Sequence, residues 1–432
     1  GYAGASISVT GDVGSICAGL VNGGTGNGFA MLSVNIYAGT NADGGEALGD
    51  LGVLSAAAIT AGQMTDGGDA LVMFNVANDL GRIQSGQIVA SGSAARIGDP
   101  SLMFNVGHDI GAIVAGRISA GTAVGDYAYA AVMFTAGNDI GKIVADSIDG
   151  GSAEGEYAAA EVLFTAGRDI GCISADRIMG GVADGEGAEA NVKFEAGRDI
   201  NAVVAGLISG TRSTRRVRTP DPAVRFLAGG DIGMIVAGRI EGGQIASDGD
   251  AEAIAAVSFR ADGTYVDADG VQSAGNIGRI IAGTITGGQA DGAGALSYVK
   301  ISAANDIGRV CADAISGGQA EDGGFSYVNI LAEHDILNFN VGTLSGSGNG
   351  SAGCDPAVQI QAYNDIKSFY ADRIVAGDDG VINILAGIDA DGNVSGEVNE
   401  NGEFEAGSIE KMVVGLIDGD DGVINIAAGG DI

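Results

Sequence analysis

The sequence predicts an all-β protein that folds as a parallel β-helix, also called a β-solenoid. Three observations support this prediction: one phrase recurs along the 432 residues, apolar and variable positions alternate within it, and the alternation changes phase at fixed places. A repeat period of about 20 to 50 residues is the sequence signature of stacked solenoid architectures. The 78 glycines also keep fixed positions among Ile, Val, Phe and Ala, which favours an ordered repeat over disorder.

The repeat is clearest in residues 131–151, AVMFTAGNDIGKIVADSIDGG, where it centres on Asp139. From Asp79 to Asp199 the equivalent residue recurs every 30 positions. We call the residue in this position the corner residue of its copy. The corner residues are Asp12, Asp50, Asp79, Asp109, Asp139, Asp169, Asp199, Asp231, Asn276, Asp306, Asp335, Asp365, Ser408 and Asp431.

Counted from the corner residue, Ile or a similar residue stands one, four and nine positions later, and Phe commonly stands five positions earlier, as in Phe134. The positions between them vary. Alternation of this kind has the period of a strand, and a change of its phase marks a corner. We therefore expect about 13 to 14 coils of about 30 residues, each with three short strands, stacked at about 4.8 Å. Parallel crossovers favour right-handed winding.

The corner itself is predicted to be a tight turn. The residue before the corner residue is Gly or Asn in most copies, for example Gly11 and Asn138, which indicates a backbone with positive φ. The corner Asp is expected to accept hydrogen bonds from turn amides. Asn276 and Ser408 take the same position, so hydrogen bonding explains the pattern better than charge.

The whole chain, residues 1–432, is predicted to be a single solenoid with insertions at 41–46, 211–225, 262–272 and 388–405. Between the copies lie seven-residue segments such as SAEGEYA at 152–158, which we expect to be acidic outer loops.

The insertion at 388–405 carries oxygen-bearing residues at alternate positions, as calcium-binding loops do. They are Asp389, Asp391, Asn393, Ser395 and Glu397. Val394 stands where a calcium loop of the EF-hand type has Gly, so an Asx-rich hairpin turn without Ca²⁺ is the alternative. The insertion at 262–272 matches the calcium pattern less closely, with Asp267 and Asp269.

The segment 211–225 differs from the others because it is basic. It contains Arg212, Arg215, Arg216, Arg218 and Arg225. It is either a solvated loop or a contact for the acidic loops of another subunit. The formal net charge of −34 argues against nucleic acid and against anionic membrane surfaces as partners.

The sequence predicts no enzymatic activity. The two histidines, His108 and His334, each precede a corner Asp, in the position that is Gly or Asn elsewhere, so we interpret them as turn residues. No phosphate-binding loop, zinc-ligand spacing or nucleophile elbow is present, and no run of about 18 apolar residues could span a bilayer.

The repeated phrase AG-x-DIG-x-I-x-AG-x-I resembles the repeat regions of large bacterial surface and adhesin-type β-solenoid proteins. The resemblance covers nearly the whole chain and implies secretion and a role in a stalk, fibre or surface layer. The alternative is a carbohydrate-binding or carbohydrate-cleaving protein like a tailspike, with Tyr127, Tyr129 and Tyr157 as candidate aromatics. Neither end of the sequence has a capping helix. Head-to-tail self-association, or continuation of a longer chain, is therefore expected.

Overall fold

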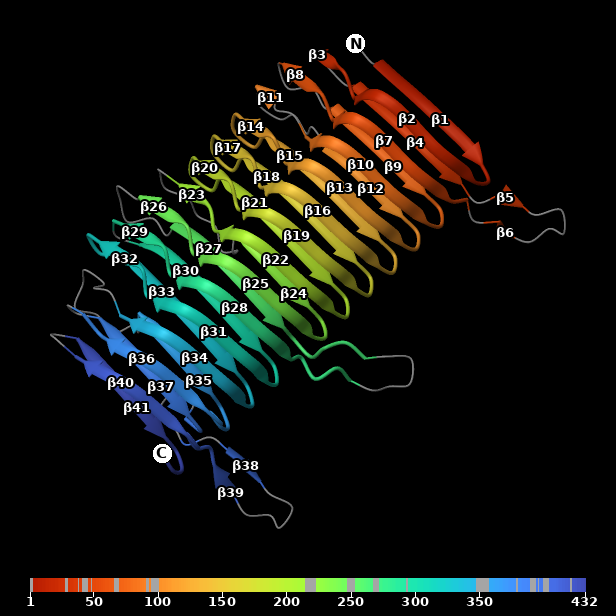
Figure 1. The fold of residues 1–432 in the computed structure, drawn as a ribbon. Helices are drawn as coiled ribbons and strands as arrows, with labels where there is room; N and C mark the ends of the chain where they lie inside the picture. Colours follow the sequence, from red (N-terminus) through yellow and green to blue (C-terminus); the bar gives the residue numbers. More distant parts are fainter. Residues whose placement is uncertain are drawn as a thin grey trace. The chain divides into compact units, whose positions relative to one another are not determined.

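The protein is an all-β parallel solenoid (Figure 1). The computed structural model describes residues 3–27, 30–37, 39–40, 46–47, 49–65, 70–90, 93–94, 101–213, 223–246, 253–266, 272–292, 294–346, 357–377, 380–388, 394, 396–398, 404–419 and 422–432, and none of them is helical. Contacts divide the chain into two compact units. Unit 1 is Gly1–Gly197 with Thr211–Thr219, and unit 2 is Arg198–Gly210 with Pro220–Ile432.

Unit 1 contains three parallel sheet faces, which we call A, B and C. Face A has β1 (Ala3–Thr10), β4 (Ala30–Tyr37), β9 (Ala70–Val76), β12 (Ser101–Val106), β15 (Tyr129–Ala136), β18 (Ala159–Ala166) and β21 (Glu189–Ala196). Face B has β2 (Val13–Asn22), β7 (Leu51–Thr60), β10 (Leu80–Val89), β13 (Ile110–Ser119), β16 (Ile140–Asp149) and β19 (Ile170–Met179). Face C has β3 (Thr25–Asn27), β8 (Gln63–Thr65), β11 (Ser93–Ala94), β14 (Thr122–Val124), β17 (Ser152–Glu154), β20 (Val182–Asp184) and β23 (Arg212–Ser213).

Unit 2 is built in the same way. Face A has β24 (Val224–Ala228), β27 (Ala253–Ala261), β30 (Ala295–Ala303), β33 (Phe325–Ala332), β35 (Val358–Ala362), β37 (Val381–Ala386) and β41 (Val423–Ala428). Face B has β22 (Ile200–Ser209), β25 (Ile232–Glu241), β28 (Ile277–Thr286), β31 (Ile307–Ser316), β34 (Ile336–Ser345), β36 (Phe369–Val375) and β40 (Met412–Asp418). Face C has β26 (Gln244–Ala246), β29 (Gln289–Asp291) and β32 (Gln319–Glu321).

A coil with strands in all three faces runs from face B through face C to face A and then turns at the corner residue; among the described residues, the coils that begin with β34, β36 and β40 have no strand in face C. Neighbouring coils pair in register, so equivalent residues lie side by side. In face A, Phe104 pairs with Phe134 and Phe134 with Phe164. In face B, Ile113 pairs with Ile143.

The core of unit 1 is a set of such ladders. Phe74, Phe104, Phe134, Phe164 and Phe194 are buried, and each ring stacks on the next with centroids 4.8 to 5.0 Å apart and planes within 4° of parallel. Stacked pairs contribute about 0.5 to 1.5 kcal/mol beyond the burial of their surface. The ladder confirms the inward direction predicted for this position.

Face B strands are longer than the short strands expected, because each one bends twice without ending. Between β10 and β13 the register is interrupted only at Gly81 opposite Gly111 and Gly86 opposite Gly116. Glycine allows a close approach at the first bend, since a Cβ on Gly141 would lie 2.5 Å from the carbonyl oxygen of Gly111 in the preceding coil. Other coils carry Asn201 and Leu337 in this position, so glycine is common there but not required. The bends let residues one, four, six and nine positions after the corner all point inward.

The seven-residue segments are not simple outer loops, which corrects the prediction from sequence. Residues 152–154 form β17 in face C, and the side chain of Ala153 is fully buried. Ala123 and Ala183 occupy the same place in β14 and β20. Small inward alanines were overlooked because acidic residues and glycines surround them. Only the turn that follows each short strand lies outside the core.

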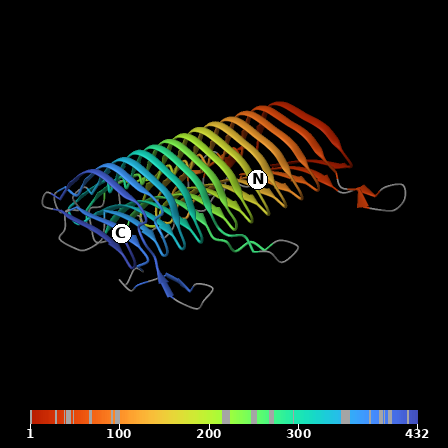
Figure 2. The ribbon, with the colours of Figure 1, turned by 60° about the horizontal axis from the view of Figure 1, so that its bottom comes forward.

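The described residues at the bases of the insertions at 41–46, 262–272 and 388–405 form antiparallel pairs, which project from the parallel strands (Figure 2). Strand β5 (Gly39–Thr40) pairs with β6 (Glu46–Ala47), and β38 (Gly396–Val398) pairs with β39 (Phe404–Ala406). Val266 pairs with Gln272, and Ile388 with Val394. Each of these antiparallel pairs therefore lies between a face A strand and the next corner residue.

Both described ends of the predicted basic segment lie in strands. Arg212 lies in β23 and pairs with Val182, and its side chain is exposed. Arg225 lies in β24 between the buried residues Val224 and Phe226, so it points outward. Both arginines were assigned to a loop because charged residues interrupt the repeat phrase there.

We predict that replacing Phe134 with alanine lowers the free energy of unfolding by about 3 to 5 kcal/mol, because it leaves a cavity between two stacked rings. Urea titration followed by circular dichroism measures the change. Thr135→Ala is the control, since Thr135 is the exposed neighbour on the same strand. Equal losses in the two variants would contradict the stacking argument.

Candidate functional site

The corner residues form a continuous row of side-chain hydrogen bonds within each unit, which we call the corner ladder. In unit 1 the backbone N–H of a corner residue donates to Oδ1 of the corner Asp one coil earlier. The N···O distance is 3.1 Å from Asp109 to Asp79 and from Asp139 to Asp109. Asp50, Asp79 and Asp169 donate in the same way to Asp12, Asp50 and Asp139.

Unit 2 continues the pattern with other acceptors. The N–H of Asp306 donates to Oδ1 of Asn276 at 3.1 Å, and the N–H of Asp431 donates to Oγ of Ser408 at 3.1 Å. The prediction that the corner residue accepts hydrogen bonds is confirmed. Its partner is an amide of the next coil, which a single-coil view of the sequence does not reveal.

The residue before the corner adds a second donor, and this corrects the prediction of positive φ. Among the described residues in this position, φ is positive at Gly11 and Gly275 but not at the asparagines. Instead, Nδ2 of Asn305 donates to Asn276 Oδ1 at 2.8 Å, and Nδ2 of Asn364 donates to Asp335 Oδ1 at 2.9 Å. Asparagine is used here for its side-chain amide.

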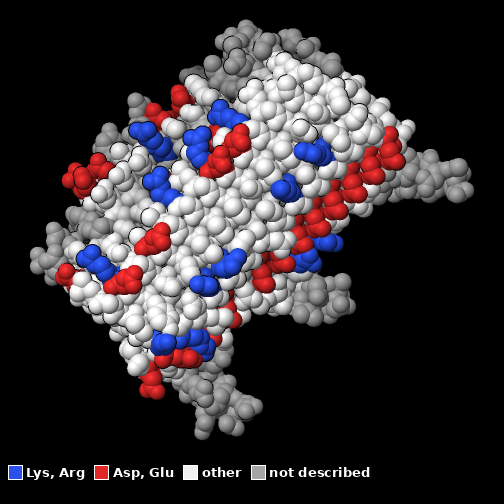
Figure 3. Space-filling model, viewed as in Figure 1, with Lys and Arg blue, Asp and Glu red and all other residues white. Residues whose placement is uncertain are grey.

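The corner ladder places carboxylates side by side, and Figure 3 shows acidic side chains in a row along one side. Like charges at this separation repel one another, and hydrogen bonds to the charged form offset the repulsion. Within each unit, Oδ1 of every corner Asp that is followed by another coil accepts a backbone N–H from that coil. Arg168 adds an ion pair to Asp139 at 3.0 Å. The ladder is therefore a compensated row of charges.

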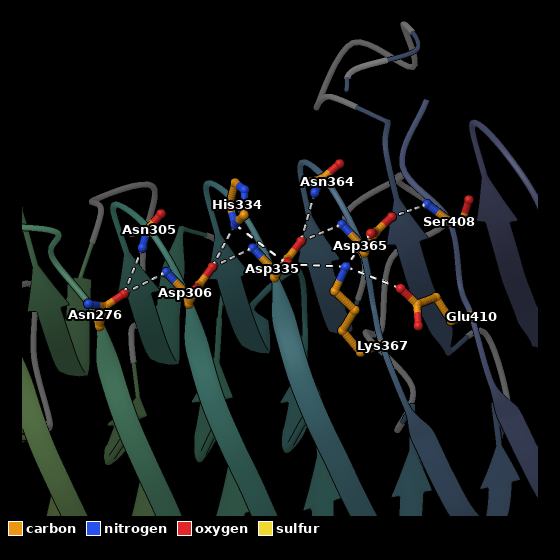
Figure 4. Close-up of polar contacts among 10 residues, drawn as sticks. All are labelled: Asn276, Asn305, Asp306, His334, Asp335, Asn364, Asp365, Lys367, Ser408 and Glu410. Atoms are coloured by element: carbon orange, nitrogen blue, oxygen red, sulfur yellow. Dashed lines mark hydrogen bonds and ion pairs between the residues drawn. The ribbon is translucent and has the colours of Figure 1, made fainter. Parts of the chain in front are cut away.

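In unit 2 the ladder gathers further charged groups around Lys367 (Figure 4). Its Nζ lies 2.5 Å from Asp365 Oδ2, 3.1 Å from Glu410 Oε1 and 3.4 Å from Asp335 Oδ2. Desolvation lowers the pKa of Lys367, but the hydrogen bonds to Asp365 and Glu410 and the attraction of Asp335 outweigh it. The pKa of Lys367 is consequently raised above its ordinary value of 10.5.

His334 occupies the position before Asp335, where Asn305 and Asn364 stand in neighbouring coils. Its Nδ1 lies 2.7 Å from Asp306 Oδ1 and 3.6 Å from Asp335 Oδ2. It therefore contacts two corner carboxylates of successive coils. The interpretation of His334 as a turn residue describes its backbone but missed this contact, because the partner lies 28 residues away.

The predicted calcium residues lie almost entirely outside the described part of the chain. Asp389, Asp391, Asn393, Ser395, Asp267 and Asp269 are not described, and Glu397 lies in β38 opposite Glu405. Of the basic segment, Arg215, Arg216 and Arg218 are likewise not described. Calcium binding and an arginine contact both stay predictions.

The aromatic candidates for sugar binding face each other. Tyr127 and Tyr157 stack with centroids 5.3 Å apart in exposed turns, and both have positive φ. The hydroxyl of Tyr129 donates to Glu161 Oε2 at 3.2 Å. The ring faces between Tyr127 and Tyr157 are used for this stacking. Stacking of equivalent residues in neighbouring coils, which forms the core, therefore also occurs at the surface.

A shallow groove of about 790 Å³ runs along face B of unit 1. It follows the second bend of each strand, and its lining includes Ala56, Gly86, Gly116 and Asp146. Cysteines 17, 172 and 311 are free thiols. In the part of the chain that is described, no helix is long and apolar enough to cross a membrane.

A comparison with known protein families, characterised proteins and solved structures finds no match for this chain. The functional proposal therefore rests on the geometry of the stacked coils and the corner ladder.

We predict that Asp109→Ala lowers the free energy of unfolding by about 1 to 3 kcal/mol, because the N–H of Asp139 loses its acceptor. Asp109→Asn should cost less, since Asn276 already fills this role in the chain. Thermal unfolding of the two variants measures the difference. If the Asn variant is as unstable as the Ala variant, the charge of the corner residue, and not its hydrogen bond, stabilises the ladder.

We predict that Lys367→Met destabilises the protein by an amount that depends on pH. A lysine with a raised pKa stabilises the fold fully below its unfolded pKa, and this contribution is lost as the pH rises through the folded pKa. The gap between wild type and variant should stay constant from neutral pH to about pH 10 and then narrow. Urea midpoints across this range test it. Lys300→Met, at an exposed lysine of β30, should show no comparable gap at neutral pH.

Proposed function

We propose that the chain is a non-enzymatic structural protein of the extracellular surface, which forms or belongs to a fibre, stalk or surface layer. The observation that supports this most directly is the regular stacking of equivalent residues along each unit, in the Phe ladder of the core and in the corner ladder. An array of this kind is held together by contacts between neighbouring coils.

At the first coil of unit 1, Ile7 stands in the ladder position of Phe74, five residues before the corner. Its exposure is 48%, whereas that of Phe74 is 1%. At the last coil of unit 2, Ile417 pairs with the fully buried Ile374 and is itself 52% exposed. A further coil, from the same chain or from another copy, would cover these two side chains as Ile374 is covered.

The partner that we propose is a coil of a second copy of the chain, joined head to tail. It would supply strands of the same length and Ile and Phe in the same ladder positions. The first and last corner residues, Asp12 and Asp431, would also extend the corner ladder. A contact of this head-to-tail type is heterologous and need not close, so it builds filaments.

The surface charge suits an extracellular assembly. A net charge of −34 keeps neighbouring assemblies apart and attracts cations. The exposed Arg212, together with Arg215, Arg216, Arg218 and Arg225, provides a positively charged segment for contacts with acidic surfaces of neighbouring copies. Ca²⁺ bound by the insertion at 388–405 would strengthen such contacts.

We predict that the purified chain forms filaments visible by negative-stain electron microscopy, and that Ile417→Lys shortens them strongly. A lysine in this ladder position places a charge in the coil-to-coil contact, where burial without a partner is costly. Imaging with EDTA, and again after Ca²⁺ is restored, tests the cation requirement.

The matched control is Leu416→Lys. Leu416 is the adjacent residue of β40, is exposed to a similar extent at 45%, and pairs with the outward-facing Arg373. It should leave filament length unchanged. Isolated particles of wild-type protein under all conditions, or equal effects of both variants, would refute head-to-tail assembly through the coils that contain Ile7 and Ile417.

A further inference from the structure

His334 contacts two corner carboxylates, whereas the hydrogen bonds of the corner ladder require a contact with only one. In the neighbouring coils, Asn305 and Asn364 stand in the same position, and each donates one hydrogen bond to a single corner residue. His334 instead brings an imidazole nitrogen to Asp306 and Asp335 together (Figure 4). The three ligand atoms lie within 4.8 Å of one another, and these residues form the one such group of His, Cys, Asp and Glu among the residues described.

The separations suit a shared metal ion. Two ligands of a tetrahedral Zn²⁺ at about 2.0 to 2.1 Å lie roughly 3.4 Å apart. The Nδ1 of His334 is 2.7 Å from Asp306 Oδ1 and 3.6 Å from Asp335 Oδ2, which brackets that value. Small adjustments of the three side chains would place an ion between them.

The ladder holds the two carboxylates in position from behind. Oδ1 of Asp335 accepts from Nδ2 of Asn364 and from the N–H of Asp365, each at 2.9 Å. Oδ1 of Asp306 accepts from the N–H of Asp335 at 3.0 Å. Bonds of this kind orient metal ligands and raise affinity. They are part of the fold and would be in place before any ion arrives.

Burial differs across the group in a way that suits an ion with a water ligand. The side chain of Asp335 is 7% exposed, while those of His334 and Asp306 are 31% and 28% exposed. One carboxylate is thus desolvated and gains from a cation, and the outer side stays open for water to complete the coordination.

Lys367 is the local competitor for an ion. Its Nζ lies 3.4 Å from Asp335 Oδ2, but it is closer to Asp365 and to Glu410. These two carboxylates hold the ammonium group on the far side of Asp335 from His334 (Figure 4). The positive charge weakens binding by Asp335 without occupying the position between Asp335 and His334.

We propose that Asp306, His334 and Asp335 bind one divalent transition-metal ion of the Zn²⁺ type. An imidazole ligand favours Zn²⁺ and its neighbours over Ca²⁺ and Mg²⁺, which take oxygen ligands. The ion would tie the corner of one coil to the corner of the next through side chains. It is separate from the calcium predicted for 388–405.

The chain offers a direct test because it has only two histidines. Protein labelled selectively in histidine gives two imidazole signals by NMR, and Zn²⁺ is titrated with the thiols alkylated. About 0.15 M NaCl and excess Mg²⁺ suppress loose binding to the acidic surface. We expect one imidazole signal to shift and saturate at one equivalent of Zn²⁺.

His334→Asn is the informative variant, because asparagine keeps the donor that neighbouring coils use in this position. It should fold normally and weaken Zn²⁺ binding, measured by calorimetry, at least about tenfold. His108→Asn is the matched control, since His108 also precedes a corner Asp but is exposed and forms no such group. It should bind Zn²⁺ as the wild type does. Unchanged binding in His334→Asn, equal loss in both variants, or no saturable shift would overturn the proposal.

Discussion

Parallel pairing in register places every side chain about 4.8 Å from the equivalent side chain of the next coil. The rest of the structure follows from one constraint: side chains of the same type must pack favourably against each other at that distance. Phenylalanine does so by stacking, as Phe104 and Phe134 show. Asparagine does so by amide hydrogen bonds, as from Asn105 to Asn75. Glycine does so where two backbones approach at a bend.

Carboxylates are the least favourable side chains in such an arrangement because their negative charges repel one another. The corner residue is nevertheless Asp in most coils. The repulsion is offset because, within each unit, Oδ1 of a corner Asp accepts a hydrogen bond from the backbone N–H of the next corner residue, so donors alternate with acceptors along the row. Where Glu410 adds a carboxylate beside Asp335 and Asp365, Lys367 supplies a positive charge. His334 lies against the same row and contacts Asp306 and Asp335.

Much of this could be read from the sequence, because the repeat itself reports the stacking. The fold, the inward Phe and Ile ladders and the accepting role of the corner residue all follow from which positions stay constant. Three features could not be read in this way. The inward alanines of face C are surrounded in sequence by acidic residues, which obscure them. The asparagines before the corner suggest a positive φ, whereas Asn305 and Asn364 donate hydrogen bonds through Nδ2. The group around His334 joins residues of two coils, and sequence alone does not distinguish His334 from the exposed His108.

The corner ladder also bears on how such a chain can change its length. Each rung needs only an acceptor in the coil before it and an N–H in the coil after it, and Asp, Asn and Ser all serve. Removal of residues 110–139 would leave Asp109 followed by Ile140, the same dipeptide that stood at both corners before. Recombination between repeats could thus add or delete whole coils while every new junction inherits a working corner. The number of coils is then free to vary in evolution, while the cross-section is not.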